Sequence, residues 1–240
     1  MPTLNPSSAY ICGNTRVGFS FAATRNGTGG TLVQNRISSG NLLASTQPIM
    51  IIKDPGRGGG TFRVRRYFLL FNTSGITSTV SSATINFETS TNNDLPRVAV
   101  VKTTSDGSST SNFADIDGFV PGDDTTMAGN VTDYSSQPAA DFSSAGLGST
   151  FTLTLNSTAL SDIQSLSTFS VGLISYNHDY LNFEPAGSSQ QFLDVGHSAS
   201  GIKLVYTLAG YSNDIIGVSS TDIGTVKGVA TANINNIIGV

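Results

Sequence analysis

The chain has 240 residues, enough for one large β domain with extensions or for two small domains. Charged residues make up only 12% and the formal net charge is −4, which argues against nucleic-acid binding by the whole domain. The scarcity of Lys and Glu, beside 26 glycines, disfavours helical surfaces and predicts an all-β protein. The single cysteine, Cys12, excludes an intrachain disulfide and is expected to be a small buried side chain.

The first residues of the chain contain neither the charged region nor the apolar core of a secretory signal. The longest apolar run near them, at residues 48–52, is far too short to cross a bilayer. We therefore expect a soluble chain with no membrane partner.

Residues 1–60 are predicted to form an arm followed by strands. Residues 1–16 are polar and contain two prolines, which is typical of an extended arm. Val17, Phe19 and Phe21 alternate with small residues and predict a strand, and residues 25–30 predict a hairpin-type turn. Further strands are expected near residues 31–36 and 47–53. The glycine-rich residues 54–60 predict a mobile turn or a domain boundary, and strands before it could still belong to the same sandwich as those after it.

Residues 61–87 form the stretch around which we expect the chain to be organised. Its first eleven residues contain no Gly or Pro, and both faces are apolar from Tyr67 onward, as in a strand buried on both sides. Residues 72–75 supply turn chemistry. Ala83, Ile85 and Phe87 then alternate with polar residues, as in a half-buried strand.

The segments RRYFLLFNTSGI and VSSATINF resemble the opening of the disaggregatase-related (DNRLRE) domains, which are similar to carbohydrate-binding modules. That family opens with an Arg-led apolar strand, an F-x-T-S-x-I turn and an SATI strand. The resemblance covers roughly residues 61–208 and implies a jelly-roll-like antiparallel β-sandwich.

The rest of the domain is predicted from local periodicity. Asn156 or Ser157 can cap a short helix whose apolar stripe is Leu160, Ile163 and Leu166. Residues 122–148 are the least patterned region, and loops of this length are usually functional or disordered. Strands are expected at residues 97–103, 151–155, 169–175, 193–195 and 202–208.

Residues 176–184 (YNHDYLNFE) are the best candidate for a binding surface, because aromatic faces beside amide and carboxylate groups are used in sugar recognition. The alternative is an aromatic corner packed on the end of the sandwich. His178 and Asp179 are adjacent, and neighbours on an extended chain point in opposite directions, which disfavours a catalytic dyad. The candidate ligand-binding residues are Tyr176, Asn177, His178, Asp179, Tyr180 and Glu184.

Two other groups of charged residues have simpler interpretations. Asp115, Asp117 and Gly118 could be part of a calcium loop, but the full ligand pattern is absent and Asp-Gly is ordinary turn chemistry, so no metal is expected. Arg63, Arg65 and Arg66 could form a basic patch with Arg57, and we expect them to be solvated or paired with acidic loops.

Residues 209–240 differ from the rest of the chain, because Gly-Val pairs recur in them every eleven residues. The repeats resemble those at the ends of virion proteins of tailed bacteriophages. Eleven residues span three turns of a slightly tightened helix, on which Ile215, Val218 and Ile223 and their repeat-mates form one stripe. The predicted assembly arm comprises Ile215, Val218, Ile223, Val226, Val229, Ile234, Ile237 and Val240.

These features predict a non-enzymatic structural or accessory protein of a phage virion, such as a capsid decoration, head fibre or tail appendage, assembled in the host cytoplasm. Other virion proteins, further copies of the chain and a host-surface glycan are the expected partners, and no cofactor is expected. One alternative is a carbohydrate-binding module or adhesin that recognises a surface glycan. A second is a hydrolase, which requires an acid pair or triad that the sequence does not reveal.

The tail provides a first test. Burying the aliphatic residues of two repeats contributes on the order of 10 kcal/mol at ~1.5–3 kcal/mol per side chain, less than the entropy of ordering ~25 residues at ~1–2 kcal/mol each. The arm therefore needs a partner. We expect the double substitution Ile223→Asp and Ile234→Asp to abolish oligomerisation or particle incorporation without changing the thermal melt of the domain. An unchanged oligomer mass and unchanged incorporation would show that the tail is passive.

Overall fold

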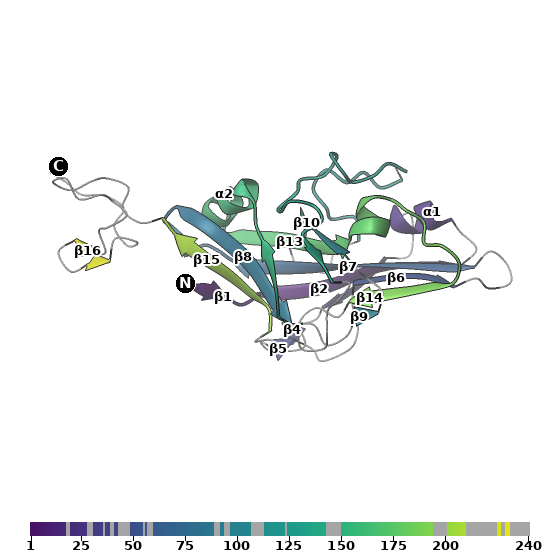
Figure 1. Ribbon diagram of the computed structural model, residues 1–240, viewed down its shortest axis with the longest axis horizontal. Helices are drawn as coiled ribbons and strands as arrows, with labels where there is room; N and C mark the ends of the chain where they lie inside the picture. The colour runs from purple at the N-terminus through teal and green to yellow at the C-terminus, as the bar shows by residue number, and fades with distance from the viewer. Residues whose placement is uncertain are drawn as a thin grey trace.

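The computed structural model describes residues 1–17, 20–27, 31–35, 37–38, 41–42, 49–54, 56, 60–88, 92–93, 97–106, 113–122, 124–142, 150–193, 201–209, 225–226 and 229–230. The protein is all-β, with antiparallel sheets in a sandwich-like arrangement (Figure 1). This confirms the fold class predicted from the composition and periodicity.

The larger sheet is built around the 12-residue strand β7 (Thr61–Asn72). One edge of β7 pairs with β2 (Ser8–Val17) from residue 61 to residue 70. Two strands share the other edge: β6 (Ile49–Asp54) pairs with residues 61–65, and β13 (Thr168–Ser175) pairs with residues 67–72. Arg66 therefore lies at the fork where β6 and β13 diverge.

The remaining strands of the larger sheet extend it on both sides. β10 pairs with β13 and β11 pairs with β10, whereas β14 pairs with β6 and β9 pairs with β14. β3 pairs with the outer edge of β2. The bounds are β3 (Thr31–Asn35), β9 (Asn92–Asn93), β10 (Arg97–Lys102), β11 (Ala140–Asp141) and β14 (Ser189–Leu193).

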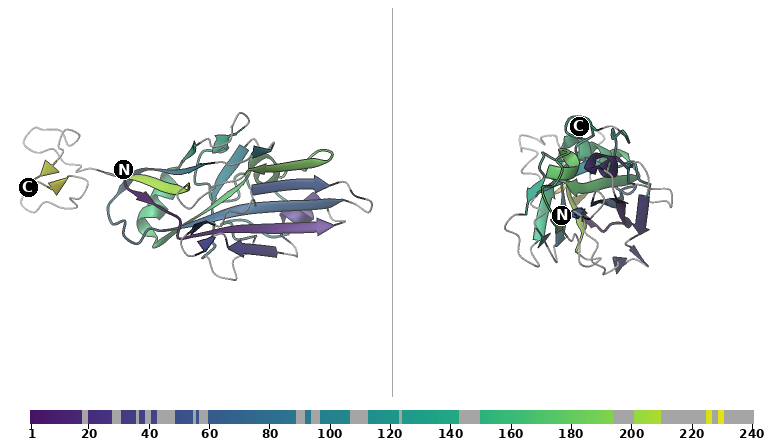
Figure 2. Two further views of the ribbon diagram at one scale, coloured as in Figure 1. Left: turned by 90° about the horizontal axis from the view of Figure 1, so that it is seen from below. Right: turned by 90° about the vertical axis from the view of Figure 1, so that its right-hand side faces the viewer.

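The smaller sheet has four strands in the order β1-β15-β8-β12. β1 joins the N-terminal residues to the last strand of the sandwich, since Thr3 lies opposite Val205. Figure 2 shows this sheet beside the long strands of the larger one. The bounds are β1 (Thr3–Leu4), β8 (Val80–Glu88), β12 (Thr150–Thr154) and β15 (Lys203–Leu208).

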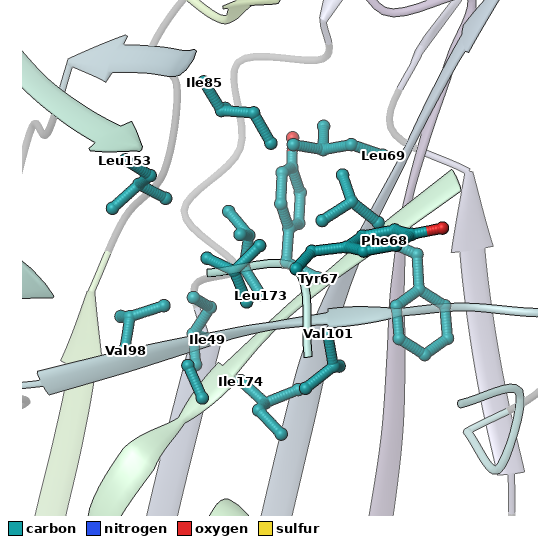
Figure 3. Packing of buried hydrophobic residues seen from close by; sticks show 14 of the residues in the cluster. Ile49, Tyr67, Phe68, Leu69, Ile85, Val98, Val101, Leu153, Leu173 and Ile174 are labelled. Atoms are coloured by element: carbon teal, nitrogen blue, oxygen red, sulfur yellow. The ribbon is translucent and has the colours of Figure 1, made fainter. Parts of the chain in front are cut away.

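The hydrophobic core lies between the sheets and is continuous through β7. Every residue from Arg66 to Phe71 is buried, which confirms the prediction of a strand covered on both faces. In Figure 3, Leu69 and Leu173 of the larger sheet share one cluster with Ile85 and Leu153 of the smaller sheet. β8 alternates buried and more exposed residues, as predicted.

The predicted helix is α2 (Ser157–Ser165). The side chain of Asn156 accepts a hydrogen bond from the backbone N–H of Ala159 at 3.1 Å, so this residue is the N-cap. Ile163 is buried, while Leu166 lies beyond the helix and is 39% exposed. α2 lies against β8 (Figure 1).

The structure corrects three predictions for the N-terminal residues. Residues 8–16 form the core strand β2 rather than an arm. Of the strand predicted from Val17, Phe19 and Phe21, Val17 ends β2, whereas Phe21 begins a short helix, α1 (Phe21–Arg25), and Phe19 lies outside the described residues. Ser20 caps this helix, and the ring of Phe21 packs 5.8 Å from that of Phe62. The boundary proposed at residues 54–60 lies between β6 and its antiparallel partner β7, so β2 and β6 belong to the same sheet as β7.

Few residues of the predicted assembly arm are described. β16 (Thr225–Val226) and β17 (Val229–Ala230) form an antiparallel pair, with Val226 opposite Val229. A helical stripe through these two valines is therefore wrong, as the low helix propensity of Thr and Val explains. Ile215, Val218, Ile223, Ile234, Ile237 and Val240 lie outside the described residues.

Two short strands, β4 (Ile37–Ser38) and β5 (Asn41–Leu42), form a further pair. Within the described part of the chain, no helix is both long enough and apolar enough to cross a membrane.

Candidate binding loop and the charge cluster beneath it

The predicted surface at residues 176–184 begins with a π-helix, η1 (Tyr176–Tyr180), directly after β13. The backbone N–H of Leu181 donates to the carbonyl of Tyr176 at 2.9 Å, which closes the five-residue turn. The turn directs Asp179 and Tyr180 into the protein, where both are buried. This corrects the assignment of these two residues to a ligand-binding surface.

Asp179 forms a two-pronged ion pair with Arg66 of β7. Its two carboxylate oxygens accept hydrogen bonds from Arg66 Nε at 2.7 Å and Arg66 Nη2 at 2.8 Å. Both side chains are essentially inaccessible to solvent. Because removing two charges from water is costly, the pair is stable only with near-ideal geometry and further hydrogen bonds.

Those further bonds come from three other segments. Arg66 Nη1 donates to the carbonyl of Phe113 at 2.6 Å, and Arg66 Nη2 donates to the carbonyl of Arg25 at 3.1 Å. Arg25, also fully buried, donates through Nε to the Asp179 carbonyl at 2.7 Å and through Nη1 to the Thr125 carbonyl at 2.9 Å. The cluster thus connects α1, β7, η1 and the loop that contains Thr125.

Two phenylalanines complete the cluster. The guanidinium carbon of Arg66 lies 3.7 Å from the ring centre of Phe113 and 4.6 Å from that of Phe119. Arg25 lies 5.8 Å from the ring of Phe119. Both guanidinium groups thus lie against electron-rich ring faces, which stabilise positive charge that is buried away from water.

A second set of contacts fixes the end of η1. The hydroxyl of Tyr180 donates to Asp133 at 2.8 Å, and its carbonyl accepts from the hydroxyl of Thr126 and the N–H of Met127 at 2.9 Å each. Burial raises the pKa of Asp133, while the hydrogen bonds from Tyr180 and Gln137 oppose that rise. The π-helix is therefore attached to residues 125–133 as well as to β7.

The loop after η1 presents an aromatic side chain that the sequence analysis did not select. The backbone of Phe183 is held on both sides: its N–H donates to the Asn177 carbonyl at 3.2 Å, and its carbonyl lies 2.5 Å from Nδ1 of His178. Asn182 takes a left-handed conformation, with φ of 58°, and donates to Asp124. The Phe183 side chain is nevertheless 64% exposed.

The other predicted residues are only partly available to a ligand. Tyr176 stacks on Tyr180 with a ring separation of 5.5 Å, and Tyr176, Asn177 and His178 are half-buried. Glu184 is exposed and forms an ion pair with Lys53 at 2.5 Å. The structure thus brings together Tyr176, Asn177, His178, Phe183 and Glu184 on one loop.

The segment considered as a calcium loop has a structural role. Asp117 accepts a hydrogen bond from the Thr132 hydroxyl at 2.6 Å. Among the described residues, no group of three or more acidic, histidine or cysteine side chains could hold a metal ion. Cys12 is fully buried, and burial together with the charge of Asp115 raises its pKa to about 12, which keeps the thiol protonated.

Part of this site could have been recognised from the sequence. Arg66 alternates with Phe62, Val64 and Phe68, and an arginine on an apolar strand face requires a buried partner. Nothing local identifies that partner, since Asp179 is 113 residues away.

No family model matches the chain, and no curated protein matches it.

The cluster predicts a contrast between two acidic residues of the same segment. Asp179→Asn removes the buried carboxylate that pairs with both guanidinium groups, so we expect a loss of ~3–5 kcal/mol in the free energy of unfolding. Glu184→Gln removes an exposed ion pair and should cost less than ~1 kcal/mol. Urea denaturation measures both. Equal, small losses would show that Asp179 does not hold the loop.

Proposed function

We propose that this protein is a non-enzymatic structural or accessory component of a phage virion, which anchors through one end of its sandwich and displays the other. Its partners are other virion proteins and further copies of the chain, and it assembles with them in the host cytoplasm. The proposal combines the resemblance of the tail repeats to phage virion proteins with the geometry of the chain ends.

The observation that carries the proposal is that the chain enters and leaves the sandwich at the same end. β1 pairs with β15, and the N–H of Tyr206 donates to the Pro2 carbonyl at 3.1 Å. The N–H of Ala209 donates to the Thr79 carbonyl at 2.7 Å, close to the turn that follows β7. An anchor attached after residue 209 would therefore hold this end.

The candidate binding loop lies toward the other end. β14 follows the loop and starts opposite Lys53, and the neighbouring Asp54 lies opposite Thr61, the first residue of β7. Figure 1 shows the N-terminus and β15 on the left and α1 on the right. Display of one end and attachment of the other is the arrangement that a decoration or fibre protein needs.

The charged side chains of the loop are already held in contacts within the protein, which supports a binding role rather than a catalytic one. Asp179 is paired with Arg66 inside the protein, Glu184 is paired with Lys53, and Nδ1 of His178 faces a backbone carbonyl. These contacts orient the loop and occupy the groups that acid–base chemistry would use.

Cysteine labelling on assembled particles tests the proposal, because the native thiol of Cys12 is buried. Ala186→Cys places a thiol on the displayed end, and Thr77→Cys places one on the end where the chain leaves the sandwich. We expect a maleimide to label both variants of the free protein but only Ala186→Cys on particles. Absence of the protein from particles, or equal labelling of both sites on them, would contradict the proposal.

A second candidate function, recognition of a surface glycan by the loop, is favoured by the exposed ring of Phe183 on a fixed backbone. A rigid aromatic face binds the C–H surface of a sugar at low entropic cost. We expect Phe183→Ala and Phe183→Leu both to lose at least tenfold in affinity for the glycan identified on an array. If Leu binds as well as Phe, the ring provides only apolar contact and sugar stacking is excluded.

A further inference from the structure

A recess lies away from the candidate loop, toward the end where the chain leaves the sandwich, since Thr168 in its wall pairs with Asn72, the last residue of β7. It has a volume of about 270 Å³ and is bordered by the end of β10, the start of β13 and the residue that follows α2. Thr168 and Ser170 are near the start of β13, whereas the candidate loop follows the end of that strand, so roughly 20 Å separates the two. The lining residues are Lys102, Thr103, Thr104, Ser105, Asp106, Tyr134, Leu166, Thr168 and Ser170.

One lining residue, Lys102, belongs to a charged pair with Asp162 of α2. Lys102 Nζ donates to Asp162 Oδ2 at 2.8 Å, and the hydroxyl of the buried Tyr134 donates to the same oxygen at 2.6 Å. Within the described residues, Oδ1 of Asp162 accepts no hydrogen bond. The pair is partly accessible, with side-chain exposures of 29% for Lys102 and 18% for Asp162.

Hydroxyl groups and one apolar side chain make up much of the remaining wall. Thr104 and Thr168 are exposed residues, and their hydroxyls form no hydrogen bond within the described part of the chain. Ser170 donates to the Ser105 carbonyl at 3.1 Å, which fixes the wall between them. Leu166 provides an exposed apolar surface on the rim.

We propose that this recess binds a single neutral sugar ring or a similar cyclic polyol. Lys102 has spare N–H donors, which suit a hydroxyl oxygen of a ring, and its partner Asp162 holds the ammonium group in position. Thr104 and Thr168 bind further hydroxyls, and Leu166 contacts the C–H face. The volume lies just below the ~300–1,000 Å³ of pockets for drug-sized ligands, which matches one ring.

The charge state of the recess favours a neutral ligand. Lys102 and Asp162 already neutralise each other, so an anion or a zwitterion would have to break their contact and compete with it. A ligand hydroxyl group adds a bond to Lys102 without separating the pair. Inorganic phosphate and glycine are therefore the appropriate competing probes.

The test is an NMR titration of the full-length protein with the methyl glycosides of glucose, galactose and mannose, and separately with phosphate and with glycine. We expect saturable shifts of the backbone amides of residues 102–106 and 166–170 with at least one glycoside. Thr104→Val and Thr168→Val keep the side-chain shape and should each weaken binding roughly two- to tenfold, the effect of losing one hydrogen bond. Asp162→Asn should weaken it further.

Thr152→Val is the matched control, because it removes an exposed strand hydroxyl on β12 outside the recess and should leave the affinity unchanged. Phe183→Ala in the same titration separates this site from the candidate loop and should also leave it unchanged. The proposal is overturned if no glycoside gives saturable shifts in these segments, if phosphate or glycine binds there more tightly, or if the two threonine variants bind as well as the parent.

Discussion

The ion pair between Arg66 and Asp179 determines how this sandwich is put together at its fork. β7 exchanges one neighbour for another at Arg66, where β6 ends its pairing and β13 begins. A fork in a sheet leaves backbone and side-chain space unfilled, and a long side chain with five donors can fill it. Asp179 supplies the charge that makes burial of this arginine tolerable, and it does so from the turn that starts where β13 leaves the sheet.

Burying these charged side chains costs free energy, and this explains which residues surround them. The two buried guanidinium groups are stabilised by the Asp179 carboxylate, by the ring faces of Phe113 and Phe119, and by backbone carbonyls of the surrounding segments. Apolar residues could have filled the same volume more cheaply. The charged cluster adds directional hydrogen bonds, in which each donor must face its acceptor. These bonds fix α1, η1 and the loop containing Thr125 relative to β7.

Elements whose signal is local could be predicted from the sequence, and elements whose signal is distant could not. The run that is apolar on both faces predicted β7, the alternation of apolar and polar residues predicted β8 and β13, and Asn156 predicted the start of α2. β2 was missed because its polar residues suggest an arm; in the fold, Asn14 is fully buried and its side-chain amide donates to the Thr24 carbonyl at 2.7 Å. Likewise the partners of Arg66 and Lys102 lie 113 and 60 residues away, beyond the reach of any periodicity.

The shared edge of β7 also has a mechanical consequence. A pull along the long axis of the sandwich, from the end where the chain leaves toward the end with the candidate loop, runs parallel to β2, β7 and their neighbours. The interstrand hydrogen bonds lie across that direction, so such a pull loads many of them together in shear instead of opening them one at a time. β6 and β13 meet on one edge of β7, and β2 pairs with the other edge of β7 across that junction. The sheet therefore has no single line across its strands along which a load can separate it.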